Sequence, residues 1–142
     1  MSKLFFTADQ HNLAGTTGSG MELWTYDGGA GGPQLVKDIN PGTNWSNPTQ
    51  LTAFGDKVAF VADDGTNGTE VWISDGTSAG TMMLKDINPG AGMGNPDNLA
   101  VLNGSLIFFA NQSDGAGGRG LWTSDGTPGG TTLVKTLDTF GG

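Results

Sequence analysis

The chain has 142 residues, with 26 glycines, no cysteine and 35% hydrophobic residues. Its net charge of -8 argues against a nucleic-acid partner, because phosphate binding requires clustered Lys and Arg side chains. Without cysteine there is neither a disulfide framework nor a thiolate metal site, and no apolar run approaches the roughly 20 residues that span a bilayer, so we expect no membrane insertion. This composition favours one all-β domain of short strands and tight turns.

The predicted strands begin with the apolar run KLFFTAD at residues 3–9. MELWTY at 21–26 and QLVKDI at 34–39 follow, and each run is short, rich in apolar or β-branched residues, and bounded by Gly, Pro, Asn or Asp. We therefore expect residues 1–39 to form a partial repeat of three strands.

Two further repeats each begin with one additional strand. Over residues 50–87 the strands are QLTAF, KVAFVAD, TEVWIS and MMLKDI, and over residues 98–138 they are NLAVL, SLIFFAN, RGLWTS and TLVKTL. The repeated unit is about 48 residues long, which is in the range of propeller-blade repeats. The sequence therefore predicts a single repeat domain over residues 1–142 with eleven strands.

Equivalent residues recur in register in the three repeats. Each of Trp24, Trp72 and Trp122 precedes a lysine by 13 residues. An aromatic residue that recurs in a strand is more often part of the hydrophobic core than of a ligand-binding surface, so we expect these tryptophans to pack between repeats. We expect the strand lysines Lys37 and Lys85 to be solvated edge charges.

The turns are predicted from two recurring patterns. Gly55-Asp56 and Asn103-Gly104 are two-residue hairpin signals, and Asn-Gly in particular suits positive φ. The motif SDGT at residues 74–77 and 124–127 predicts a second hairpin, with the aspartate capping its own turn and glycine supplying positive φ.

The link between repeats distinguishes the candidate architectures. Residues 40–50 are long enough to cross three strand spacings, about 14 Å, from one edge of a four-stranded sheet to the opposite edge of the next. Antiparallel sheets joined in this way are β-propeller blades. The alternative is a β-trefoil, which would close within one chain.

Three blades do not close a ring, since propellers typically have 4 to 8. The first repeat also lacks its first strand, which leaves open edges that natural proteins pair or cover. We therefore expect a homodimer in which two chains assemble head to tail into a six-bladed ring.

The stretch ADDGTNGTEVWISDGTSAGTMMLKDINPGAGMGNP, at residues 62–96, resembles the bacterial ELWxxDGT repeat. The resemblance covers nearly the whole chain, which would be a three-blade fragment or an engineered product. It implies β-propellers in secreted or cell-surface proteins and implies no enzymatic activity. The opening MSKLFF is too short and too soon polar for a signal peptide. The first repeat departs from the motif at Asp27-Gly28-Gly29, and the third has Gly120 where the others have Glu22 and Glu70.

Recognition is expected at the end of the blades that carries the loops of variable length, because variable loops on a rigid scaffold commonly bind ligands. Trp45 is an aromatic residue among Asn, Ser and Pro, where it would stack on a sugar face, contact another subunit or simply anchor the loop. His11 has no partner at metal-ligand spacing and is read as a surface residue. The candidate ligand-binding residues are Trp45, Met93, Asp9, His11, Asp114 and Arg119.

A calcium site is the candidate metal site. Asp63, Asp64 and Glu70 flank the glycine-rich loop ADDGTNGTE and would supply hard oxygen ligands. The competing interpretation makes Asp64-Gly65 an ordinary turn and Glu70 an exposed strand residue.

No pattern of catalytic residues is apparent. Glu22 and Glu70 are equivalent residues of adjacent repeats rather than an acid/base pair, and the motif serines have no histidine nearby. The sequence therefore predicts a non-catalytic module that serves as a binding or structural scaffold. The alternatives are a glycan-binding lectin, of propeller or trefoil fold, or a protein-binding module, with a hydrolase as a distant third.

Overall fold

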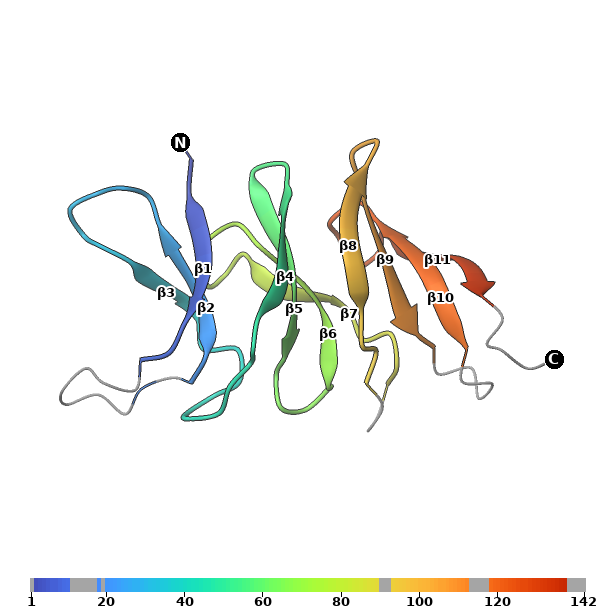
Figure 1. Cartoon of the computed structure of the whole chain (residues 1–142), viewed down its shortest axis with the longest axis horizontal. Helices are drawn as coiled ribbons and strands as arrows, with labels where there is room; N and C mark the ends of the chain where they lie inside the picture. Colours follow the sequence, from blue (N-terminus) through green and yellow to red (C-terminus); the bar gives the residue numbers. More distant parts are fainter. Residues whose placement is uncertain (1, 11–17, 19, 90–92, 113–117, 138–142) are drawn as a thin grey trace.

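A computed structural model describes residues 2–10, 18, 20–89, 93–112 and 118–137. These residues form three antiparallel sheets that lie side by side along the long axis of the molecule (Figure 1). The described ranges contain strands and turns without a helix, so no helix capable of crossing a membrane is found there. The all-β prediction is confirmed.

The sheets follow the order of the chain, each as an antiparallel meander. The first contains β1 (Leu4–Ala8), β2 (Glu22–Tyr26) and β3 (Gln34–Lys37). The second contains β4 (Thr49–Phe54), β5 (Lys57–Asp63), β6 (Thr69–Ser74) and β7 (Thr81–Lys85), and the third contains β8 (Asp97–Leu102), β9 (Ser105–Asn111), β10 (Arg119–Ser124) and β11 (Thr131–Leu137). The three sheets do not close on one another, in contrast to the single-chain closure of a trefoil.

The strand register is the same in every sheet. The pairs Phe6–Trp24, Phe60–Trp72 and Phe108–Trp122 are directly opposite across neighbouring strands. Each tryptophan also follows a register shift against the next strand, as occurs at a β-bulge. Residues that are equivalent in the sequence are therefore equivalent in space, and each sheet serves as an internal control for the others.

Both predicted hairpins are present. Gly55 (φ 62°), Asn103 (φ 52°) and Gly104 (φ 78°) adopt positive φ in the two-residue turns. In the SDGT turn, the Thr77 amide and hydroxyl donate to Asp75 Oδ1 at 2.8 and 2.7 Å, and these bonds hold the pKa of Asp75 below its ordinary value. The third sheet repeats the arrangement with Asp125 and Thr127. The recurring motif is first of all a hairpin.

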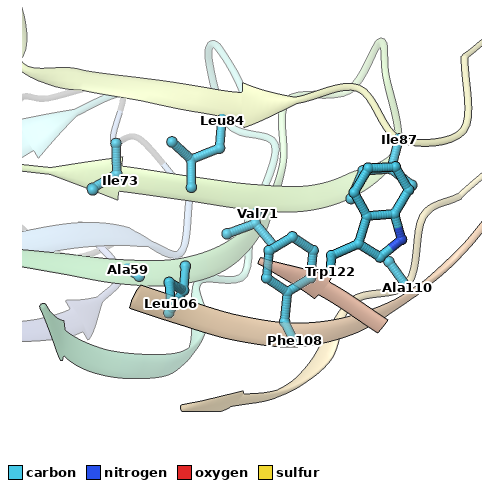
Figure 2. Packing of buried hydrophobic residues seen from close by; sticks show 9 residues of the cluster. All are labelled: Ala59, Val71, Ile73, Leu84, Ile87, Leu106, Phe108, Ala110 and Trp122. Atoms are coloured by element: carbon cyan, nitrogen blue, oxygen red, sulfur yellow. The ribbon is translucent and has the colours of Figure 1, made fainter. Parts of the chain in front are cut away.

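The hydrophobic core lies between the sheets. We call the face toward the next sheet in the chain the trailing face, and the face toward the preceding sheet the leading face. Trp72 and Trp122 are both 7% exposed and lie on leading faces, which confirms that these two tryptophans pack between sheets. The trailing face of the second sheet contributes Ala59, Val71, Ile73, Leu84 and Ile87, which meet Leu106, Phe108, Ala110 and Trp122 of the third (Figure 2). The same interface between the first and second sheets contains Leu23, Val36 and Ile39 against Val58, Phe60, Ala62 and Trp72.

Candidate functional site

Among the residues that the structure describes, no sheet packs against the leading face of the first sheet. Leu4 is 60% exposed, whereas its equivalents Val58 and Leu106 are 4% and 0% exposed. Phe6 is likewise only half-buried, whereas Phe60 and Phe108 are fully buried. The first sheet therefore presents to solvent the side chains that form the core elsewhere.

The trailing face of the third sheet is open in the same way. Val134 is 56% exposed, whereas its equivalent Leu84 is 1% exposed. Leu137 is 37% exposed, compared with 5% for Ile87. The molecule thus exposes two apolar faces, one leading and one trailing. Inside the chain, a leading face and a trailing face pack against each other at every interface between sheets.

Two lysines join one sheet to the next. Lys37 is half-buried, whereas Lys85 is exposed, as expected of a solvated edge charge. Lys37 Nζ donates to the Thr81 carbonyl oxygen at 3.2 Å, and Lys85 Nζ donates to that of Thr131 at 3.4 Å. Lys85 Nζ also lies 5.5 Å from the centroid of the Trp122 ring, within cation–π range. The equivalent Lys135 is exposed on the open trailing face.

Glu22 anchors the loop between the first and second sheets. Its fully buried carboxylate accepts hydrogen bonds from the amides of Ile39 (3.1 Å), Asn40 (3.3 Å) and Ser46 (3.2 Å), and from the Ser46 hydroxyl (2.5 Å). Burial raises the pKa of Glu22, and the Ser46 hydroxyl opposes that rise. This glutamate therefore fixes both ends of the loop with one side chain.

Glu70 does the same for the next loop with fewer donors. It accepts from the amides of Ile87 (3.3 Å) and Gly94 (3.1 Å), and Gly94 stands where the first loop has Ser46. Burial raises the pKa of Glu70 to about 7, and the charge of Asp86 adds to the rise. The interpretation of Glu70 as an exposed strand residue is wrong, because its exposed fraction is 0%.

The anchored loops also bond to the following sheet. The Ser46 carbonyl oxygen accepts from the Asp63 amide at 2.9 Å, and the Gly94 carbonyl oxygen accepts from the Asn111 amide at 2.7 Å. Each glutamate therefore stabilises a contact between sheets through the loop that it holds.

Among the candidate ligand residues, Trp45 and Met93 occupy equivalent exposed positions in separate loops. Trp45 is 50% and Met93 52% exposed, and their carbonyl oxygens accept from the side-chain amides of Asn40 and Asn88 at 3.2 and 3.3 Å. The loops are thus held at the backbone while both side chains face solvent. The Trp45 loop also approaches Gly20 closely, since a Cβ there would lie 2.1 Å from Trp45 Cδ1.

The other candidate ligand residues are not brought to one place by the described chain. Asp9 is exposed just beyond β1. Arg119 forms an ion pair with Asp97 and donates to Asn111 Oδ1 at 3.1 Å, so it joins three strands of the third sheet. His11 and Asp114 lie outside the described residues.

The candidate calcium ligands have separate hydrogen-bonding roles. Asp63 Oδ1 accepts from the Gly65 amide at 2.7 Å. Asp64 Oδ1 accepts from the amides of Thr66 and Asn67 at 2.9 and 2.8 Å, while Glu70 holds its loop. No group of three or more metal-ligating side chains occurs among the residues that the structure describes.

Comparisons of the chain with protein-family models, curated proteins and solved structures found no match.

Proposed function

We propose that the chain is a non-catalytic β-propeller repeat module, of the kind that its resemblance to ELWxxDGT repeats implies, and that it self-assembles through its two open faces. In this proposal the trailing face of one copy packs on the leading face of another. Two copies related head to tail form a closed six-bladed ring that serves as a scaffold.

The observation that carries the proposal is the contrast between equivalent residues. Leu4 and Val134 are exposed, but each has an equivalent that is almost completely buried between sheets. Burial of such side chains contributes about 1.5–3 kcal/mol each, so an interface that reproduces the internal packing would be strongly favoured.

Polar groups on the open faces support the same pairing. Lys135 is equivalent to Lys85, and Pro33 is equivalent to Thr131. In a head-to-tail contact Lys135 Nζ would meet the Pro33 carbonyl oxygen and the Trp24 ring, as Lys85 meets Thr131 and Trp122. Such complementarity specifies one register.

We expect sedimentation equilibrium to give twice the chain mass of 14.5 kDa for the wild type. Val134→Asp or Leu4→Asp places an unpaired carboxylate in the interface, so each should raise the dissociation constant at least about a hundredfold. Met93→Asp is the matched control, because Met93 is equally exposed but lies in a loop.

Mixing the two variants tests the head-to-tail arrangement. Leu4→Asp protein keeps an intact trailing face and Val134→Asp protein keeps an intact leading face, so one productive interface remains in a mixed pair. We expect the mixture to form heterodimers although neither variant dimerises alone. A monomeric wild type, or variants that dimerise like the wild type, would contradict the proposal.

A second candidate function, glycan or protein binding by the loops, is favoured by the exposure of Trp45. An aromatic ring held at the backbone and open to solvent suits stacking on an apolar sugar face or a partner side chain. We expect Trp45→Ala to abolish any signal on a glycan array. The substitution should leave the mass of the species in solution, measured by sedimentation equilibrium, the same as that of the wild type. A signal that persists in the variant would assign binding to another surface.

A further inference from the structure

The first sheet has a free strand edge. The equivalent strands β5 and β9 each pair on both sides, with β4 and β6 and with β8 and β10. Among the described residues β1 pairs with β2 alone. A row of backbone donors and acceptors on β1 is therefore available to another extended chain.

A groove lies beside this free edge. It has a volume of about 780 Å³ and is lined by Phe5 of β1 and by Leu51 and Ala53 of β4. The equivalent groove between the second and third sheets has a volume of about 320 Å³ and is lined by Phe54, the last residue of β4, and by Gly55 of the turn that follows. The two grooves are thus equivalent. The second is smaller because β4 lies beside it, whereas the first sheet has no strand equivalent to β4 among the described residues.

Phe54 shows what fills the groove. It packs against the core between the second and third sheets together with Leu99, the equivalent of Leu51. It also covers Gly126, since a Cβ on Gly126 would lie 2.8 Å from Phe54 Cε1. In the first groove the side chain of Lys3 covers the equivalent Gly76 and donates to the Asp75 carbonyl oxygen at 3.1 Å. Lys3 is exposed, so displacing its side chain would break one solvent-accessible hydrogen bond.

We infer that the edge of β1 and its groove bind an extended peptide as a fourth, antiparallel strand. The ligand is a polypeptide segment with the pattern of β4, in which an aromatic side chain at the Phe54 position enters the groove and packs on Leu51. Main-chain hydrogen bonds supply affinity and the aromatic residue supplies specificity, as in strand addition to other sheet edges. The inference does not depend on ring closure.

The probe is a synthetic peptide with the sequence NPTQLTAFGD, which is that of residues 47–56. Phe54 and Lys57 flank a two-residue hairpin and form a hydrogen-bonded pair, so Phe54 and Thr52 direct their amides toward β5 whereas Ala53 directs its amide away. N-methylation at the Thr52 position of the peptide therefore blocks pairing with β1. N-methylation at the Ala53 position is the matched control.

We expect calorimetry to show one parent peptide bound per chain. Methylation at the Thr52 position, or replacement of the phenylalanine by aspartate, should weaken binding at least about tenfold, and the control peptide should bind like the parent. Amide exchange should slow at Phe5 and Thr7, the residues of β1 equivalent to Ala59 and Val61, and not at Phe6.

Measurements on Val134→Asp protein separate this inference from self-assembly, because the edge of β1 is unchanged in that variant. Absence of binding to both proteins, equal weakening by the two methylations, or equal binding of a scrambled peptide would overturn the inference.

Discussion

Phe60→Ala is expected to lower the free energy of unfolding by about 3–5 kcal/mol, the usual cost of removing a buried phenyl ring and leaving a cavity. Phe60 is completely buried between the first and second sheets, where it packs with Leu23, Val36 and Trp72. Urea denaturation followed by circular dichroism measures the change.

The equivalent Phe6→Ala is the internal control. Phe6 occupies the same register position opposite a tryptophan, but no sheet covers it and it is only half-buried. In monomeric protein we therefore expect it to cost about 1 kcal/mol. In the proposed self-assembly its larger effect should be on association. Equal losses of unfolding free energy for the two variants in monomeric protein would show that the first sheet is not open as described.

The strands and turns were predictable because their signals are local. Short apolar runs bounded by turn residues predicted all three sheets, and Asn103-Gly104 predicted its hairpin from the preference of these residues for positive φ. Gln50 was not predictable in this way. It adopts φ 54° in a register shift of β4, and its side chain accepts from the Leu99 amide in the next sheet.

Contacts between sheets were harder to predict, because the alternation of side chains between the two faces of a strand does not show which element packs against each face. Lys37 and Lys85 read as edge charges, yet both donate to carbonyl oxygens of the following sheet. The exposure of Val134 also required the structure, since it lies in the same Leu-Val-Lys tripeptide as the buried Val36.

The role of the glutamates had a sequence signal that composition did not reveal. Glu22 and Glu70 occur at equivalent positions in the two repeats that are followed by an Asn-Pro loop. Their hydrogen bonds to Ile39, Ser46 and Gly94 show that each glutamate holds the loop that follows its repeat.

Neutralising Glu70 is expected to remove a pH dependence of stability. The pKa of Glu70 is raised from an ordinary value of 4.5 to about 7 in the folded chain, so folding favours the protonated carboxyl. The resulting stabilisation is fully present below pH 4.5 and is lost as the pH rises through about 7. Over that window the free energy of unfolding should fall by about 2–3 kcal/mol, from 1.36 kcal/mol per unit of pKa difference.

Urea denaturation of the wild type and of Glu70→Gln between pH 5 and 8 tests this expectation. The variant should be less stable at pH 5, because an amide cannot reproduce the contacts of the carboxyl. It should lose less stability toward pH 8 than the wild type, and the loss that remains is due to Glu22, whose pKa is also raised by burial. Lowered pKa values of Asp64 and Asp75 act at more acidic pH and are common to both proteins. Parallel curves for the two proteins would exclude Glu70 as the titrating group.

Gly94→Ser transfers the hydroxyl of the first loop to the second. Ser46 donates to Glu22 at 2.5 Å, and an added Cβ at Gly94 would lie 2.5 Å from Glu70 Oε2, so the end of the glutamate side chain must turn slightly to accept the new hydroxyl. A hydroxyl donor favours the ionised carboxylate, and the variant should therefore lose less stability between pH 5 and 8 than the wild type. Ser46→Gly should have the opposite effect through Glu22, steepening the loss. If neither substitution changes the slope, the two loops do not control the ionisation of the glutamates that hold them.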